Sequence, residues 1–402
     1  MYRTRTLVKT LIRASKNFRA VLVTGMRQVG KTTFLEKSSE AKRAYVTLDN
    51  PLDVTLAKEE PEFFFETHPA PVLIDEVQYA PELFRYVKML VDTSKKKGLV
   101  WMTGSQQYNL MAGLTESLAG RVAVLDLLGF SLYEREGKGA MHKPFLPPNR
   151  PAGVLKKRSL AATYKIIWEG SYPEVAGSSR EEWFLFYDSY LRTYLERDIR
   201  QLINIENEAA FLKFLSCAAA RTAQELNLTD MARDAGIAPN TAKAWLSLLE
   251  TSGIVYLLRP YHRNITKRLT KRPKLYFMDT GLCAYLTRWT SPETLEAGAM
   301  SGAFFETFVV QEILKSYCHN GRRPALYYYR DSNKVEIDLL LEEDGVFYPV
   351  EIKKTSNPAK SDIKAFKAFA AFEKTGCGSL ICLTDKARPL EAGVNAISLW
   401  DM

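Results

Sequence analysis

The sequence predicts an α/β protein of several domains, with a parallel sheet flanked by helices in its N-terminal part. At 402 residues the chain is too long for one ordinary core, and its length suggests two or three domains. Apolar runs of strand length alternate with helical patterns between about residues 18 and 135, as a parallel sheet requires. The first run, Ala20-Val-Leu-Val-Thr24, leads directly into a glycine-containing loop and a helix, which indicates a buried strand.

The loop after this strand carries the pattern G-x-x-x-x-G-K-T, from Gly25 to Thr32. Its glycines let the backbone turn tightly, so that N–H groups face a phosphate chain, and the helix that begins near Lys31 directs its positive end at the same place. Lys31 would reach the β- and γ-phosphates of ATP, and Thr32 would offer its hydroxyl to Mg²⁺. The predicted nucleotide contacts in this loop are Gly25, Gln28, Val29, Gly30, Lys31, Thr32 and Thr33.

A second motif follows at Pro71-Val-Leu-Ile-Asp75-Glu76. This apolar run ends in two carboxylates and is similar to a Walker B strand, in which Asp75 would hold Mg²⁺ and Glu76 would polarise the attacking water. An ordinary buried strand that ends in two acids is the alternative for this run alone. Together the two motifs predict an ATPase that uses ATP and Mg²⁺, with Lys31 and Glu76 as catalytic residues.

Composition argues against a secreted or membrane protein. The start of the chain lacks the apolar core of a signal peptide, and no stretch approaches the roughly 18 apolar residues of a membrane span. The five cysteines show neither C-x-x-C spacing nor a nearby histidine cluster, which favours reduced thiols over disulfides or zinc. We therefore expect a cytoplasmic protein without membrane contact.

Positive charge is concentrated in two segments. The net charge is +9; the first twenty residues carry six Lys/Arg without an acid, and residues 259–274 carry seven. Segments of one sign suit a polyanion such as nucleic acid. For each segment, a solvated basic face without a partner is the alternative.

The region after the sheet predicts a linker and then a long helix. Residues 137–151 are rich in Gly, Pro and Lys without an apolar period, which is typical of an exposed linker. From residue 180 to 204, aromatic and aliphatic side chains recur at helical spacing, and we expect these aromatics to belong to a core.

A helix-turn-helix pattern follows at residues 229–250, with a turn at Gly236, and two strand-like runs come after it. This order of elements predicts a winged helix. If it binds DNA, Asn240, Thr241 and Lys243 would face the groove. The side chains predicted to hold DNA phosphates are Arg263, Lys267, Arg268, Lys271 and Arg272. In the alternative, the winged helix is a structural lid on the ATPase core or on a neighbouring subunit.

The C-terminal region places acids and a lysine in a particular order. Glu306 lies on a predicted helix, Asp338 on a following strand, and Glu351-x-Lys353 on the next strand. This set resembles the core of PD-(D/E)xK nucleases, although Ile337 replaces the motif's proline. By that resemblance Glu306, Asp338 and Glu351 would bind Mg²⁺ and Lys353 would position a hydrolytic water. The alternative is an exposed Glu/Lys pair on a strand edge.

Several further motifs extend across nearly the whole chain: Leu-Ile-Asp-Glu-Val-Gln, Thr-Gly-Ser-Gln-Gln, Glu116-Ser-Leu-Ala-Gly-Arg121, Tyr194-Leu-Glu-Arg-Asp198 and Tyr276-Phe-Met-Asp-Thr-Gly-Leu282. With the phosphate loop they resemble a prokaryotic family of AAA-type ATPases with a restriction-endonuclease-like C-terminal domain. The resemblance implies a homo-oligomeric ring, such as a hexamer, in which an arginine of one subunit completes the site of the next. The candidates for this arginine are Arg121 and Arg197, with a salt bridge within the subunit as the alternative, and the candidates for a γ-phosphate sensor are Thr103, Ser105 and Gln106.

These observations predict four domains: a P-loop ATPase core (1–140), a linker and helical lid (141–205), a winged helix (206–295) and an α/β restriction-endonuclease-like domain (296–402). The favoured function is an ATPase that binds DNA, branched DNA included, and remodels it or moves along it. The alternatives are a nucleotide-dependent switch that acts on a protein partner, and an ATP-gated, Mg²⁺-dependent nuclease.

Overall fold

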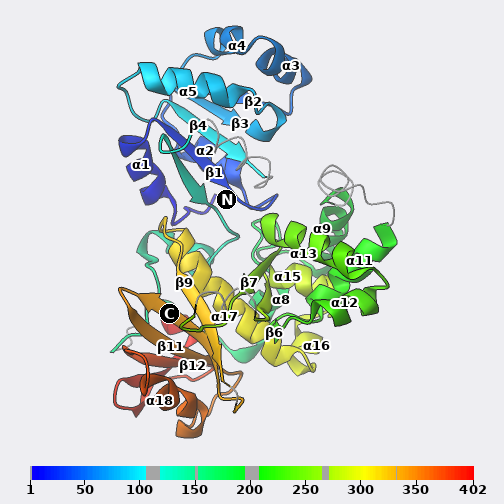
Figure 1. Cartoon of the computed structure of the whole chain (residues 1–402), viewed down its shortest axis with the longest axis vertical. Helices are drawn as coiled ribbons and strands as arrows, with labels where there is room; N and C mark the ends of the chain where they lie inside the picture. Colours follow the sequence, from blue (N-terminus) through cyan, green and yellow to red (C-terminus); the bar gives the residue numbers. More distant parts are fainter. Residues whose placement is uncertain (1, 106–117, 150–152, 195–207, 265–270, 332) are drawn as a thin grey trace. The chain divides into compact units, whose positions relative to one another are not determined.

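The structure, a computed structural model, describes the chain except for residues 1, 106–117, 150–152, 195–207, 265–270 and 332. It divides into two compact units (Figure 1). Unit 1 comprises residues 1–143, 251–253 and 317–322; unit 2 comprises residues 144–250, 254–316 and 323–402. The division into four domains stays a prediction.

Unit 1 is built on a five-stranded sheet with the order β2-β3-β4-β1-β5, and every neighbouring pair is parallel. The predicted α/β class with a parallel sheet is therefore confirmed for this part of the chain. All residues of β1, β3 and β4 are buried, which explains why their sequences are continuous apolar runs. The strands are β1 (Ala20–Thr24), β2 (Ala44–Thr47), β3 (Val72–Asp75), β4 (Val100–Gly104) and β5 (Val122–Asp126).

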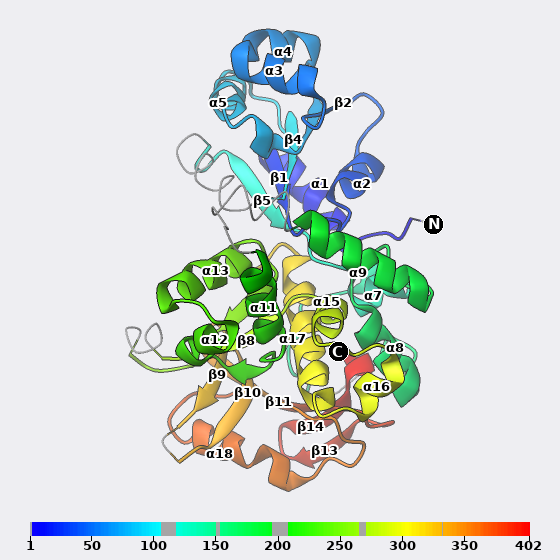
Figure 2. The same ribbon diagram turned by 90° about the vertical axis from the view of Figure 1, so that its right-hand side faces the viewer.

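A hydrophobic core joins this sheet to α3, α4 and α5, three helices that lie close to each other in both views (Figures 1 and 2). Leu22, Ile74 and Met102 lie side by side on neighbouring strands, so their side chains point to the same face of the sheet. They enter one core together with Phe64 and Phe84 from the helices. The helices of unit 1 are α1 (Val8–Asn17), α2 (Lys31–Ser38), α3 (Pro51–Glu59), α4 (Pro61–Thr67), α5 (Leu83–Thr93) and α7 (Leu132–Arg135).

The first part of unit 2 is mainly helical and carries a three-stranded antiparallel sheet with the order β6-β8-β7. Two helices surround Gly236 as predicted, and this glycine ends the first of them with a left-handed φ of 74°. The assignment as a winged helix stays a prediction. The elements are α8 (Leu160–Glu169), α9 (Arg180–Tyr194), α11 (Glu208–Ala219), β6 (Gln224–Glu225), α12 (Leu228–Ala235), α13 (Pro239–Thr251), β7 (Val255–Leu258), β8 (Lys274–Phe277), α15 (Thr280–Leu286) and α16 (Pro292–Ala297).

The second part of unit 2 contains a six-stranded mixed sheet with the order β13-β14-β12-β11-β10-β9. Strands β11, β12 and β14 run parallel to each other, whereas β9, β10 and β13 pair antiparallel with their neighbours. The nuclease-like assignment of this sheet stays a prediction. The elements are α17 (Ser301–Cys318), β9 (Ala325–Arg330), β10 (Glu336–Glu343), β11 (Val346–Ile352), α18 (Lys364–Ala370), β12 (Gly378–Cys382), β13 (Arg388–Glu391) and β14 (Val394–Ser398).

Asp279, in the motif from Tyr276 to Leu282, is a buried structural centre of unit 2. Its carboxylate accepts hydrogen bonds from the Leu282 N–H (2.7 Å), which caps α15, and from the hydroxyl of Tyr187 (2.6 Å). A Cβ at position 281 would lie 2.1 Å from the Tyr187 hydroxyl, so only glycine fits there. This motif is therefore explained by packing. None of the helices in the described ranges is long and apolar enough to cross a membrane.

Candidate functional site

The predicted ATP-site residues meet at one edge of the unit 1 sheet. Asp75 is the last residue of β3, and the loop that starts at Gly25 follows β1. The strand register pairs Val23 of β1 with Thr103 of β4. Because parallel strands end at the same edge, Asp75, Thr103 and the loop lie close together, at the position where open α/β sheets bind ligands.

The loop itself depends on its two glycines. A Cβ on Gly25 would lie 2.1 Å from the carbonyl oxygen of Leu127, which follows β5, so the close approach of this backbone excludes a side chain. Gly30 has a left-handed φ of 86° and is the residue directly before α2. Helix α2 begins at Lys31, as the sequence predicts, and directs its N-terminal N–H groups toward the loop.

Lys31 lies folded against this loop. Its ammonium group donates to the carbonyl oxygens of Gly25 (3.1 Å) and Met26 (2.9 Å), and the side chain is buried. The lysine is therefore held at the position from which it can contact a phosphate chain that the loop binds.

Asp75 is the centre of a hydrogen-bond network. Its Oδ1 accepts from the hydroxyls of Thr32 (2.7 Å) and Thr103 (2.5 Å), and its Oδ2 accepts from the hydroxyl of Tyr45 (3.4 Å). The same Thr103 oxygen accepts from the N–H of Glu76 (3.0 Å). Thr103 thus fixes both acidic residues of the motif. Partial burial, followed by the charge of Asp75, raises the pKa of Tyr45 to about 12.

Glu76 adopts a strained backbone conformation with φ 55°, which is uncommon for a residue with a side chain. Its Oε2 accepts hydrogen bonds from the Gln78 amide and from the Ser105 hydroxyl (3.3 Å), and these two side chains also contact each other (3.2 Å). The carboxylate that would polarise water is therefore held by two neutral polar groups.

The sequence gave no role to Tyr45 or to Gln78, the last residue of the motif Leu-Ile-Asp-Glu-Val-Gln, and it left Thr103, Ser105 and Gln106 as equal candidates for one role. Gln78 had a signal, because it follows Glu76 by two residues at the carboxyl edge of the sheet. Tyr45 had none, because its contact with Asp75 depends on the pairing of β2 with β3. Gln106 lies outside the described residues. Thr33 is exposed on α2.

Of the two predicted arginines, Arg121 lies within the described residues. Arg121 pairs with Asp92 of the same chain, with its Nε 2.6 Å from Oδ1, and both side chains are more than one-third exposed. This contact is the salt bridge within the subunit that the sequence left as the alternative. Arg197 lies outside the described residues.

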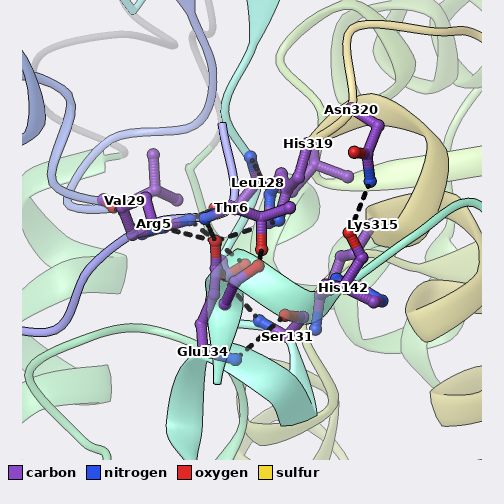
Figure 3. Close-up of polar contacts among 12 residues, drawn as sticks. Arg5, Thr6, Val29, Leu128, Ser131, Glu134, His142, Lys315, His319 and Asn320 are labelled. Atoms are coloured by element: carbon purple, nitrogen blue, oxygen red, sulfur yellow. Dashed lines mark hydrogen bonds and ion pairs between the residues drawn. The ribbon is translucent and has the colours of Figure 1, made fainter. Parts of the chain in front are cut away.

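A buried ionic network, which the sequence analysis did not single out, supports the phosphate loop from below (Figure 3). Arg5 donates to the carbonyl oxygen of Val29 in the loop (3.0 Å), and its Nε lies 3.2 Å from Oε1 of the fully buried Glu134. His319, also fully buried, lies 3.3 Å from Glu134 through Nδ1 and accepts the Leu128 N–H at Nε2 (3.2 Å).

Glu134 is charged because its surroundings compensate for its burial. Burial alone would raise the pKa of Glu134, but the Arg5 guanidinium and contacts with His319 and the Ser131 N–H outweigh it and hold this pKa well below its usual range. The Ser131 N–H lies 3.0 Å from Oε2, as part of a capping box at the start of α7. The carboxylate thus orients Arg5, which in turn holds the loop.

One of the predicted DNA contacts, Arg263, forms an ion pair within the chain. Arg263 pairs with Glu373, Nε to Oε1 at 2.7 Å. Lys271 and Arg272 are exposed, whereas Lys267 and Arg268 lie outside the described residues. On α13, Asn240 and Lys243 are exposed and Thr241 is half-buried.

The predicted nuclease-like residues come close together in unit 2, with an additional group among them. The ammonium of Lys274 on β8 lies 3.4 Å from Glu306, 3.4 Å from Asp338 and 2.6 Å from Glu336. Burial by itself would lower the pKa of Lys274. The nearby carboxylates raise this pKa by more than burial lowers it, so it lies above its usual range. Lys353 pairs with Asp362 (2.9 Å) and lies 3.8 Å from Glu351.

Three stretches of the sequence match known protein families. Residues 17–136 match the AAA domain family. Residues 161–293 and 301–402 match two families described as domains of unknown function, DUF8612 and DUF4143. Uncharacterized protein Rv2008c of Mycobacterium tuberculosis and Uncharacterized protein Mb2031c of Mycobacterium bovis are each 30% identical over 352 residues, or 87% of this chain and 74% of theirs.

The chain belongs to the family of these mycobacterial proteins. Its N-terminal part is an AAA domain, which confirms the predicted AAA-type ATPase core. Among solved structures, a RuvB variant of Thermotoga maritima is 15% identical over 66% of this chain and 94% of that one, with a TM-score of 0.32. The DNA clamp loader delta protein of Bacillus subtilis (YqeN) is 10% identical over 61% and 88%, with a TM-score of 0.25. TM-scores this low do not establish a shared fold.

The AAA domain implies Mg²⁺ with its nucleotide, and the residues present fit it. Thr32 and Asp75 offer a hydroxyl and a carboxylate oxygen next to each other, which are hard ligands of the kind that Mg²⁺ prefers. No group of three or more His, Cys, Asp or Glu in the described ranges could hold a metal by itself. That absence is compatible with a nucleotide site, in which one or two protein ligands act together with substrate phosphates.

Thr103→Val tests whether Thr103 positions the acids. The substitution removes one donor to Asp75 and the acceptor for the Glu76 N–H, so we expect ATP hydrolysis to fall about 10- to 100-fold. Steady-state phosphate release measures it. Thr24→Val is the matched control, because Thr24 is equally buried at the same edge but donates to Asp126 (2.9 Å). Equal losses in both variants would contradict the assignment.

The depressed pKa of Glu134 predicts a pH dependence of stability. A carboxylate whose pKa is lower in the folded than in the unfolded protein stabilises the fold. This contribution is fully present at pH values above the unfolded-state pKa of about 4.3, and it is lost as the pH falls below that value. We expect the wild type to lose roughly 1.4 kcal/mol more per pH unit below about pH 4 than Glu134→Gln does. Urea unfolding at several pH values between neutral and acid measures this difference, and parallel curves for the two proteins would refute it.

Proposed function

We propose that the protein binds ATP with Mg²⁺ at the carboxyl edge of the unit 1 sheet and hydrolyses it. The observation that carries this proposal is the convergence of Lys31, Thr32 and Asp75 beside a loop in which Gly25 has no room for a side chain. The AAA domain family to which residues 17–136 belong supports it.

Each residue has a role that its contacts support. The loop N–H groups and the start of α2 bind the phosphates, and Lys31 exchanges its carbonyl partners for phosphate oxygens. Thr32 and Asp75 hold Mg²⁺, which when bound neutralises charge on the β- and γ-phosphates. Glu76, held by Gln78 and Ser105, orients and polarises the attacking water. In this arrangement Ser105 is a positioning residue for Glu76.

We propose further that the protein works as a homo-oligomer on DNA. The exposed Lys271 and Arg272, with Asn240 and Lys243 on α13, supply positive and hydrogen-bonding groups of the kind that phosphates and bases attract. Arg121 and Arg197 remain the proposed arginines that complete a neighbouring subunit's site. To serve that site, Arg121 would have to leave Asp92, an exchange that costs little because both side chains are well exposed.

A second candidate is a nucleotide-dependent switch that acts on a protein partner. The specific observation in its favour is that three of the seven basic residues of segment 259–274, Arg259, Arg263 and Lys274, are engaged in ion pairs within the chain. The charge that this segment has available for DNA is correspondingly lower.

ATP hydrolysis with and without DNA separates these candidates. We expect Glu76→Gln to lower kcat at least about 100-fold while ATP still binds, because only the polarisation of water is lost. Single-stranded, duplex and four-way-junction DNA are added in turn. Stimulation of the wild type by one form supports action on DNA. Hydrolysis that is indifferent to every DNA favours the protein-directed switch, and hydrolysis that survives Glu76→Gln contradicts the proposed site.

The matched variant for the DNA arm is Lys271→Glu with Arg272→Glu. Both side chains are exposed, so the double substitution should leave basal hydrolysis and folding intact. We expect it to weaken DNA binding for all sequences and to reduce the salt dependence of binding, because phosphate contacts release counterions. DNA binding that is unchanged over a salt series would remove these residues from the proposed surface.

A further inference from the structure

We infer that the ammonium group of Lys274 is the resident cation of the C-terminal acid cluster. Together they form an ionic clamp, by which we mean one ammonium held by three carboxylates, and this clamp takes the place of a divalent metal. The acid cluster is defined as Glu306 on α17 with Glu336 and Asp338 on β10. All of these residues and Lys274 belong to unit 2. The inference concerns another part of the chain than the proposed ATP site and does not depend on it.

The ammonium lies where the acids converge. It is within 3.4 Å of oxygens of Glu306 and Asp338 and within 2.6 Å of Glu336, so its three N–H donors have three carboxylates to bind. The Lys274 side chain is only 5% exposed. A buried ammonium is costly to desolvate unless it is compensated in this way, and a single lysine is compensated here by three acids.

Strand β8 fixes the ammonium in place. Lys274 pairs with Glu225 of β6 on one side and with Leu258 of β7 on the other, so it lies on the central strand of its sheet. Tyr276, two residues along and therefore on the same face, donates its hydroxyl to Glu306 (2.6 Å). The strand thus presents two donors, Lys274 and Tyr276, to the acids of α17 and β10, and it joins the two sheets of unit 2.

A divalent cation could not share this position. Mg²⁺ requires close octahedral coordination by oxygens, and an ammonium in contact with the same carboxylates repels it. The second oxygen of Asp338, Oδ2, accepts a hydrogen bond from the Ile352 N–H (3.0 Å). Across the described ranges, no group of His, Cys, Asp or Glu suited to a metal is found, and the acid cluster is no exception.

The lysine of the nuclease-like motif is also occupied. Lys353 lies 2.9 Å from Asp362, whose carboxylate in turn accepts the Ala359 N–H (2.8 Å). Its ammonium also lies 3.8 Å from Glu351, so Lys353 belongs to a second ion network, with Asp362 and Glu351. The four residues that the sequence assigned to a metal-dependent nuclease are thus divided between two ion networks, and the predicted Mg²⁺ at Glu306, Asp338 and Glu351 does not fit.

Manganese binding tests the inference directly. Nucleotide-free protein carrying Asp75→Asn, which removes the metal ligand of the ATP site, is titrated with Mn²⁺ and followed by electron paramagnetic resonance and by thermal unfolding. We expect no Mn²⁺ bound at the acid cluster while Lys274 is present. Bound Mn²⁺ that is released by adding Asp338→Asn would overturn the inference.

In the same background, Lys274→Met should create the metal site that the lysine excludes. Loss of the ammonium leaves three carboxylates without a cation, so we expect Tm to fall by roughly 6–12 °C. Mn²⁺ should then bind and recover most of this loss. The matched control is Lys315→Met, because Lys315 is fully buried on α17 and lies 2.9 Å from the carboxylate of Glu312, outside the acid cluster. Its Tm should fall without recovery by Mn²⁺.

Lys274→Arg keeps the inference testable if the methionine variant does not fold. Arginine retains a cation on β8, so this protein should fold and still exclude Mn²⁺. A folded Lys274→Met protein with unchanged Tm, or Mn²⁺ binding by Lys274→Arg that Asp338→Asn abolishes, would contradict the clamp.

Discussion

The carboxylate of Asp75 is the point on which the ATP site depends. It accepts hydroxyls from Thr32 at the start of α2 and from Thr103 on β4, while Thr103 also binds the backbone of Glu76. These bonds are possible only because β1, β3 and β4 are parallel and end at the same edge. The topology of the sheet therefore brings the loop from Gly25 to Thr32, the proposed magnesium ligands and the acid proposed to polarise water within reach of each other.

A second constraint acts in both units: a charged side chain that is buried needs a compensating partner. In unit 1, Glu134 is matched by Arg5 and contacts His319, and Arg5 carries this support to the phosphate loop. In unit 2, Lys274 is matched by three acids. Removing one member of such a network leaves the others desolvated without a partner, which is why these contacts determine the fold more strongly than exposed pairs such as Arg121–Asp92 do.

Sequence patterns predicted the local features well and the long-range ones poorly. The loop from Gly25 to Thr32 was identifiable because glycine placement and the following helix are encoded in consecutive residues. Helices α12 and α13 around Gly236 were identifiable for the same reason. By contrast, Lys274 was counted as one of a run of exposed basic residues, because only the pairing of β8 with β6 and β7 directs it to acids that lie 32 to 64 residues further along the chain.

The same limit applies to the network of Glu134. Nothing in the residues around Arg5 indicates a partner at position 134 or a histidine at 319, since these contacts arise from tertiary packing. The nuclease-like motif shows a different limit. Its order of acids and lysine is a local pattern that the sequence carries, but its chemistry depends on which cation lies between the acids.

Equilibrium binding of ATP, measured with and without Mg²⁺, tests the central claim most directly. The arrangement of Lys31, Thr32 and Asp75 predicts that the wild type binds ATP, that Lys31→Ala loses most of this affinity in either condition, and that Asp75→Asn weakens binding only when Mg²⁺ is present. Wild-type protein that fails to bind ATP, or a Lys31→Ala variant that binds it equally well, would contradict the account.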